Sequence, residues 1–173
     1  MTLAPQPSES RVAITDANLR KMRGLFASGV TAVTTALDGR LRGVTVSAFT
    51  SVSLDPPLVL IALANETTLR DMLAESGIFA VNLLSDDQEF LSERFAGRAP
   101  IVNEEFEGVP YSVAVTGAPI LGQSLAWYDC RVEATHPGGD HTLFVGRVEA
   151  MGFGDEGRAP LIYFANRYVR LRG

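Results

Sequence analysis

The stretch 43–64, GVTVSAFTSVSLDPPLVLIALA, decides the fold expected for this chain. Up to Ala48 it alternates apolar and hydroxyl-bearing residues, a pattern typical of a strand with one polar face. Asp55, Pro56 and Pro57 then predict a bend, because proline has no N–H to donate to a sheet ladder. The run 58–64 is continuously apolar, which favours a strand buried on both faces. The stretch therefore predicts two strands joined by a bend.

The hydroxyl groups of this stretch suggest a binding surface. They begin at Thr45 and continue to Ser53, beside a strand that is expected to be apolar. A hydrogen bond contributes little net stability, so such a row is a poor way to stabilise a core. It is well suited to line a polar, planar ligand. The alternative is a solvated strand face with no ligand.

The rest of the chain adds further strands and few helices. Asp38 and Gly39 lie between two strand-like runs and predict a hairpin turn. Residues 127–135 alternate, and 141–153 read as a long strand. Asp16 is expected to cap a helix whose apolar residues follow helical spacing. About seven strands, three short helices and no βαβ alternation predict a mainly β fold, an antiparallel barrel rather than a Rossmann domain.

Composition and charge exclude several classes of function. The chain has 173 residues, the size of one domain, and a formal net charge of −5, which argues against a nucleic-acid partner. Its longest apolar run, 58–64, is too short to span a membrane. The single cysteine, Cys130, excludes an internal disulfide. Residues 1–13 are expected to form a flexible tail and 14–173 one domain. No secretory signal begins the chain, so a cytoplasmic protein is expected.

Several motifs, taken together, resemble one family. The segment GVTVSAFTSVSLDPPLVL closely resembles the one shared by short-chain flavin reductases, the small components of two-component flavin-dependent monooxygenases. The similarity covers roughly residues 17–171, and its further motifs are NETT at 65–68, FAVNL at 79–83, FAG at 95–97, GDH at 139–141 and PLIYF at 160–164. This resemblance implies a split β-barrel of Greek-key type, usually a homodimer with flavin bound near the subunit interface.

The resemblance implies an NAD(P)H:flavin oxidoreductase. Such an enzyme takes hydride from NADH or NADPH and supplies reduced FMN or FAD to a separate monooxygenase. Two alternatives stay open: a flavin-binding protein without turnover, and a split-barrel oxidase acting directly on a small substrate. The chain has no Gly-x-Ser-x-Gly, no His-Glu-x-x-His and no cysteine cluster, so neither a nucleophile nor a metal is expected.

The resemblance also assigns cofactor contacts. Those expected at the flavin ring or its ribityl chain are Thr45, Val46, Ser47, Ala48, Thr50 and Ser51. Near the phosphate, the family pattern places Asn65, Thr67 and Thr68, although Asn and Thr are also ordinary helix caps. Phe95 lies where the family has a residue near the cofactor, but an aromatic on a helix is as often part of the core.

The sharpest expectation for a single residue concerns His141. It follows a Gly-Gly-Asp turn, where members of the family present a histidine towards the flavin and the nicotinamide. Its implied role is orientation or charge stabilisation, and the alternative is a histidine bonded to its own turn. Tyr168 is expected either to border the nicotinamide site or to pack at a dimer interface.

Two parts of the chain depart from the family pattern: the phosphate loop, and the final segment, where Ala165 and Asn166 stand in place of a more basic pattern. The phosphate loop often contains a basic residue, whereas this chain has the acidic Glu66 there. Arg70 is the basic residue nearest to this loop in the sequence. It is close enough in the sequence to compensate for the acidic residue.

Overall fold

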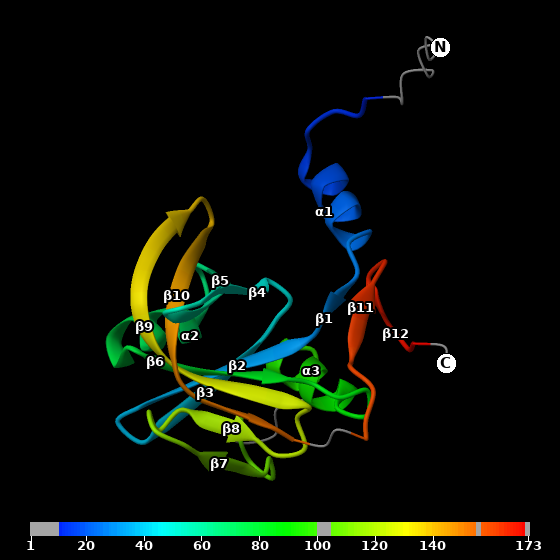
Figure 1. Ribbon diagram of the computed structural model, residues 1–173. Helices are drawn as coiled ribbons and strands as arrows, with labels where there is room; N and C mark the ends of the chain where they lie inside the picture. Colours follow the sequence, from blue (N-terminus) through cyan, green and yellow to red (C-terminus); the bar gives the residue numbers. More distant parts are fainter. Residues whose placement is uncertain (1–10, 100–104, 155–156, 172–173) are drawn as a thin grey trace, which may run out of the picture.

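A seven-stranded antiparallel sheet forms the body of the molecule (Figure 1). The computed structural model describes residues 11–99, 105–154 and 157–171. The strands run in the order β3-β2-β6-β9-β10-β5-β4. Their bounds are β2 Thr31–Leu37, β3 Arg40–Val46, β4 Phe49–Leu54, β5 Pro57–Ala64, β6 Ile78–Leu83, β9 Ala126–Gly138 and β10 His141–Phe153. The expected mainly β, antiparallel architecture is confirmed.

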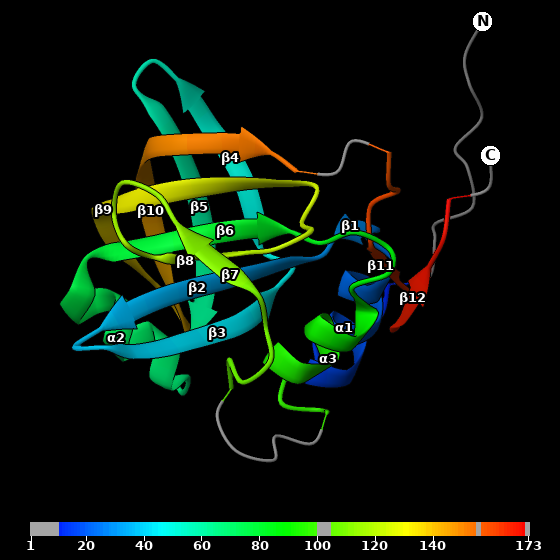
Figure 2. The same ribbon diagram turned by 90° about the horizontal axis from the view of Figure 1, so that it is seen from below.

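The sheet is rolled up because its two edge strands follow one another in the sequence. β3 and β4 lie at opposite ends of the strand order, yet only Ser47 and Ala48 separate them. The carbonyl of Ala48 accepts a hydrogen bond from the backbone N–H of Ala62 in β5 (3.1 Å). Figure 2 shows the resulting curl of the strands. Ser47 and Ala48 thus form a seam where the two edges of the sheet meet.

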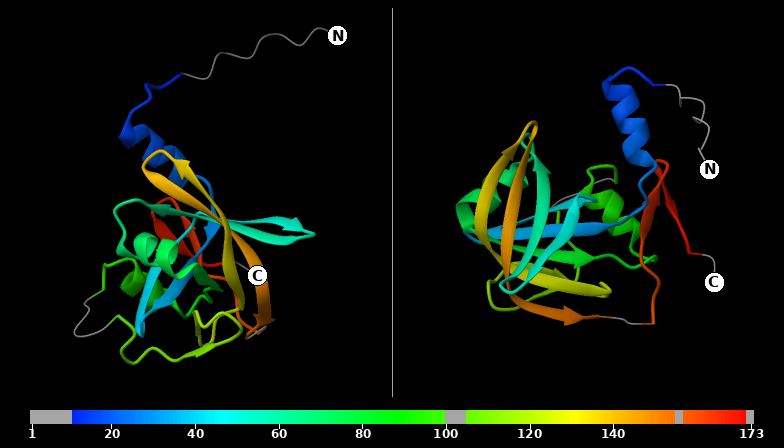
Figure 3. Two further views of the ribbon diagram at one scale, coloured as in Figure 1. Left: turned by 90° about the vertical axis from the view of Figure 1, so that its left-hand side faces the viewer. Right: turned by 45° about the horizontal axis from the view of Figure 1, so that its top comes forward.

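Three helices and five short strands complete the described part of the chain. Helix α2 packs against β2 and supplies Leu69 and Leu73 to the core. Helix α1 stands off the barrel, and the β4–β5 hairpin projects from the body of the barrel (Figures 1 and 3). The bounds are α1 Asp16–Gly24, α2 Thr68–Ser76, α3 Glu89–Phe95, β1 Ser28–Gly29, β7 Tyr111–Val113, β8 Pro119–Leu121, β11 Ile162–Phe164 and β12 Arg167–Val169.

The turn between β2 and β3 confirms the predicted hairpin. Asp38 and Gly39 have φ angles of 50° and 76°. A two-residue turn of this kind requires positive φ at both positions, and Asp followed by Gly adopts it readily. The register then pairs Leu37 with Arg40. Local chemistry therefore fixes this part of the sheet.

Two expectations for the stretch 43–64 are wrong. It forms three strands instead of two, because the chain breaks at the seam and β4 pairs with β5. Strand β5 is also not buried on both faces: Val59, Ile61 and Leu63 are buried, while the residues between them are partly exposed. The reason is that only one face of β5 points into the barrel. The other face borders the cavities described below.

Helix α1 forms where expected but differs in its cap and its packing. Thr15, not Asp16, is the N-cap, and its side chain accepts a hydrogen bond from Asn18 (3.2 Å). None of the helix residues is buried. The helix is tied to the rest of the chain at its C-terminal end, where Ala165 donates a backbone hydrogen bond to Gly24 (2.7 Å).

The ends of the chain carry little structure that can be described. Residues 1–10 of the expected tail lie outside the described residues, and residues 11–13 are exposed, without helix or strand. No helix in the described ranges has the length and apolar character needed to cross a membrane.

Candidate functional site

Two adjoining cavities lie at the seam of the barrel and share Arg23, Ser47 and Ala48. The seam cavity has a volume of about 380 Å³ and is lined by Arg23, Gly24, Phe26, Ser28, Ser47, Ala48, Phe49, Thr50, Leu60, Tyr163 and Asn166. The His141 cavity has a volume of about 200 Å³ and is lined by Arg23, Val44, Thr45, Val46, Ser47, Ala48, Ala62, Leu63, Ala64, Thr67 and His141.

These cavities bring together seven of the residues that the sequence singled out. They are Thr45, Val46, Ser47, Ala48, Thr50, Thr67 and His141. They come from β3, the seam, β4, the loop before α2 and the start of β10, so the closure of the barrel is what assembles them. Their assigned contacts with a flavin stay predictions.

His141 is the first residue of β10 and lies opposite Ala64 of β5. Its Nδ1 lies 2.6 Å from Oδ1 of Asp140. This contact lowers the pKa of the Asp140 carboxyl from its ordinary value, chiefly through the hydrogen bond itself. The Nε2 atom has no hydrogen-bond partner among the residues that the structure describes. The ring is therefore held by its own turn and also lines a cavity, while its role towards the flavin and the nicotinamide stays a prediction.

Asn65 holds the turn that precedes His141. Its backbone N–H donates to the carbonyl of Asp140 (2.9 Å), and its side-chain amide donates to the carbonyl of Gly139 (3.2 Å). Its side-chain oxygen accepts a hydrogen bond from Thr142 (2.7 Å). The end of β5 is thus bound to the β9–β10 hairpin, which fixes the position of the histidine.

The hydroxyl groups predicted to contact the cofactor differ in their hydrogen-bond partners. Thr45 donates to the carbonyl of Ser92 (2.6 Å), and Thr67, the N-cap of α2, donates back to Ala64 (2.9 Å) without making a cap bond. Thr50 donates to the carbonyl of Ser51. The hydroxyl of Ser47 bonds to none of the described residues, so it is free to bind a ligand at the seam.

Five of the sequence-derived residues, including Tyr168, lie outside both cavities. Phe95 is 3% exposed and packs against Phe106 (ring centroids 5.3 Å apart), as a core aromatic does. Ser51 and Thr68 are exposed on β4 and at the start of α2. Asn65 is also outside, at the rim.

Tyr168 is likewise outside both cavities but touches one of their walls. Its hydroxyl donates to Glu93 (2.5 Å) and lies 2.8 Å from Oγ of Ser92. Its ring packs edge-on against Tyr163, which lines the seam cavity (centroids 5.2 Å apart). Burial, with the hydrogen bond to Glu93, raises the pKa of the Tyr168 phenol. Tyr168 therefore supports the site through Tyr163 and α3.

Sequence reasoning missed Arg23, Phe49, Leu60, Tyr163 and Asn166. Phe49 gave no signal of its own, because an aromatic residue on a strand is as readily part of the core, and its ring does pack against Tyr128 (centroids 5.7 Å apart) while lining the seam cavity. For Asn166, the left-handed φ of 61°, next to a φ of 50° at Ala165, marks a tight turn in the C-terminal hairpin that reaches the seam. Nothing local marked Arg23, which reaches the site from a helix far away in sequence.

Comparisons with known proteins identify the class. The model of the flavin reductase like domain matches residues 22–172. An NADH-dependent flavin reductase of Rhodococcus sp is 42% identical over 161 residues, which cover 91% of this chain and 88% of the relative. The reductase component of 4-hydroxyphenylacetate 3-monooxygenase from Thermus thermophilus is 44% identical over 146 residues, 84% of this chain and 90% of the relative. The chain therefore belongs to the flavin reductase-like family.

Solved structures agree with this assignment. The NADH:FAD oxidoreductase SgcE6 of Streptomyces globisporus, in complex with NAD and FAD fragments, matches with a TM-score of 0.86 and 32% identity, covering 95% of this chain and 98% of that chain. The expected split β-barrel and the expected enzyme class, a flavin reductase, are confirmed. The comparisons favour a reductase over the two alternatives.

The residues at the seam fit a flavin. The larger cavity alone falls in the size range of small-molecule sites. Phe49, Leu60 and Tyr163 offer apolar surface for a planar ring, and Ser47 offers a free hydroxyl. Within the described ranges, no group of three or more His, Cys, Asp or Glu side chains gathers as a metal site.

Proposed function

We propose that this protein is an NADH-dependent flavin reductase that supplies reduced FMN or FAD to a separate monooxygenase. The observation that carries the proposal is the joining of the apolar seam cavity to the His141 cavity through Arg23, Ser47 and Ala48. One space suits a planar ring, and the other holds a histidine beside it. The names of the relatives, which include monooxygenase reductase components, support the same assignment.

The protein contributes position and exclusion of water. Hydride transfer from a nicotinamide to a flavin is chemistry that the two cofactors supply when both are bound. In this proposal, Phe49 and Leu60 pack on the ring, while the Ser47 hydroxyl and the backbone of the seam bind its polar edge. His141, fixed through Nδ1 by Asp140, presents Nε2 to the nicotinamide and stabilises charge there.

The proposal includes a homodimer. Leu25 and Phe26 at the end of α1 are 63% and 78% exposed, and Leu54 at the tip of the β4–β5 hairpin is 92% exposed. A helix of nine residues is marginal without a packing partner. A second copy of the chain that covers α1 would supply this packing. It would also shield the side of the seam cavity at Phe26.

We also place the enzyme in the cytoplasm, where its proposed hydride donor is regenerated. Separation of cell fractions, followed by assay of NADH-dependent flavin reduction, tests this location. Activity confined to a membrane or exported fraction contradicts it.

Steady-state kinetics test the function directly. The oxidation of NADH and NADPH is followed with riboflavin, FMN and FAD in turn. We expect NADH oxidation that depends on added flavin and saturates with it. A protein that binds flavin but oxidises neither nucleotide is a flavin-binding protein without turnover. A protein that reduces its own flavin only in the presence of another small substrate is an oxidase.

A further inference from the structure

The loop expected to hold the flavin phosphate has no available cation of its own. It carries Glu66, and Arg70 follows in the first turn of α2. The guanidinium of Arg70 is already occupied: Nη1 donates to Asp71 (2.7 Å) and Nε to the hydroxyl of Thr142 (3.3 Å). Arg70 also lines neither cavity. The nearest basic residue in sequence is therefore engaged in structural contacts.

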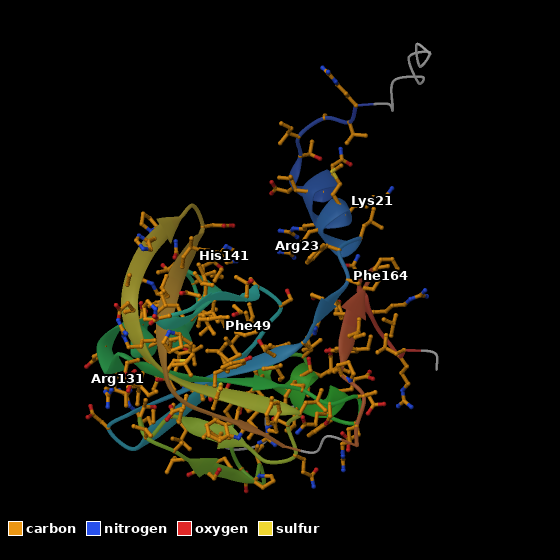
Figure 4. The ribbon with its side chains drawn as sticks, in the orientation of Figure 1. Lys21, Arg23, Phe49, Arg131, His141 and Phe164 are labelled. Atoms are coloured by element: carbon orange, nitrogen blue, oxygen red, sulfur yellow. The ribbon has the colours of Figure 1, made fainter. Side chains whose placement is uncertain are left out.

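Arg23 reaches the site from α1 instead. It lines both the seam cavity and the His141 cavity. Figure 4 shows Arg23 on the side of α1 that faces the barrel and His141, whereas Lys21 lies on the opposite side. Two residues along a helix correspond to a rotation of about 200°, which explains this separation. Among the described residues that line the seam cavity and the His141 cavity, Arg23 is the one arginine or lysine.

The guanidinium of Arg23 is available to a ligand. It makes no hydrogen bond or ion pair with any residue that the structure describes. Its charge nevertheless acts on the turn before His141: together with the larger effect of His141, it lowers the pKa of the Asp140 carboxyl. Asp140 belongs to the same turn that Asn65 binds. A positive field therefore covers the end of the site where the sequence pattern expects a phosphate.

We propose that Arg23 binds the phosphate of the flavin nucleotide and so makes this enzyme prefer FMN or FAD over riboflavin. The inference rests on the proposed function in that a flavin is the ligand. A guanidinium is suited to this task, since it offers paired donors that match phosphate oxygens. The flavin phosphate is favoured over that of the nicotinamide nucleotide because Arg23 shares the seam cavity with Phe49 and Leu60, the wall proposed for the ring.

The geometry also explains how the acidic loop is tolerated. Glu66 is exposed and lines neither cavity, so solvent screens its repulsion of a phosphate. Arg23, on another element, supplies the positive charge on the opposite side. In this proposal, Arg23 on α1 takes the place of the basic residue that the family resemblance led us to expect in the loop.

Binding titrations with three flavins test the proposal. Dissociation constants of riboflavin, FMN and FAD are measured by flavin fluorescence, without a nicotinamide nucleotide, for the wild type and for Arg23→Gln, Arg23→Lys and Lys21→Gln. We expect Arg23→Gln to weaken FMN and FAD binding about tenfold, the effect of one charge-assisted contact at an exposed site. Riboflavin binding is unchanged. Arg23→Lys retains most of the FMN affinity, and Lys21→Gln, which removes the same charge from the opposite helix face, changes it less than twofold.

A second measurement does not depend on any variant. Inorganic phosphate competes with FMN for the wild-type protein but not with riboflavin. Equal losses for riboflavin and FMN in Arg23→Gln, or unchanged FMN binding, overturn the proposal. So does a variant whose only change is a raised KM for NADH, which places Arg23 at the nicotinamide nucleotide. Because binding is measured without NADH, a protein that holds FMN through Arg23 yet oxidises no NADH refutes the reductase function and leaves this inference standing.

Discussion

The hydroxyl of Thr142 donates a 2.7 Å hydrogen bond to the side-chain oxygen of Asn65. This bond joins the residue that follows β5 to the second residue of β10. It lies next to the Gly139–Asp140 turn that precedes His141. Thr142 is 6% exposed, so the bond is shielded from water. The residue that the family pattern places near the phosphate thus also holds the turn.

A double-mutant cycle measures this bond. Asn65→Ala and Thr142→Val are each expected to lower the free energy of unfolding by about 1 kcal/mol, with a coupling energy of about 0.5–1.5 kcal/mol. Urea unfolding provides the four values. A control cycle pairs Asn65→Ala with Thr135→Ala, an exposed position on β9, and is expected to be additive. Additivity in the Asn65–Thr142 cycle contradicts the role assigned to the bond.

His141→Ala is expected to reduce NADH-dependent turnover by about 1–3 kcal/mol of transition-state free energy, or about 5- to 150-fold. The reason is the loss of one polar group that Asp140 holds in place at the cavity. Stability and flavin affinity change less, which urea unfolding and flavin titration check. His136→Ala is the matched control, because His136 is exposed on β9 and lines neither cavity. A His141→Ala enzyme with wild-type turnover and an unchanged KM for NADH shows that the assigned role is wrong.

Gly43→Ala is expected to destabilise the fold by about 1–3 kcal/mol. A Cβ atom at this position would lie 2.7 Å from two ring atoms of Phe95, which is buried and has little room to move. Gly29→Ala is the control, since nothing lies within 4 Å of its Cβ position. Urea unfolding of both variants gives the comparison. Equal stability of Gly43→Ala and the wild type is incompatible with the packing of Phe95 against β3.

Light scattering at micromolar concentration is expected to give the mass of a homodimer. Leu25→Glu should shift the protein towards monomer, because it places a charge on the exposed apolar face of α1. Val113→Glu, on β7 far from α1 in Figure 1, should not. A wild-type protein that is monomeric with flavin present refutes the dimer.

Flavin is expected to behave as a substrate that is released. The polar side chains that line the two cavities are mostly neutral, and neutral contacts contribute about half as much as charge-assisted ones. With Arg23 as the one arginine or lysine among the described lining residues, we expect a dissociation constant no tighter than about 10 nM. Dialysis should remove the flavin, and NADH oxidation should recover as FMN is added. Dialysed protein that retains a full, non-exchanging flavin and reduces no added flavin refutes this expectation.

Local sequence patterns were enough to predict the elements whose causes lie in neighbouring residues. Asp38 and Gly39 set a hairpin because two adjacent residues accept positive φ, and His141–Phe153 was recognisable as a strand. The motifs around Ser47 and His141 were sufficient to name the family and to select seven of the residues that line the two cavities. Short-range periodicity and turn chemistry are written in consecutive residues, so they can be read without the fold.

Tertiary structure decided which of these residues meet. Strand β5 reads as buried on both faces, but the closure of the sheet at Ser47 and Ala48 leaves one face open to the cavities. Phe95 belongs to a motif yet lies in the core beside Gly43, and Arg70 is near the phosphate loop in sequence yet donates a hydrogen bond to Thr142 of β10. Arg23 reaches the site because a backbone bond between Gly24 and Ala165 anchors α1 beside the seam. Such contacts depend on pairing between segments far apart in the chain, which no local pattern specifies.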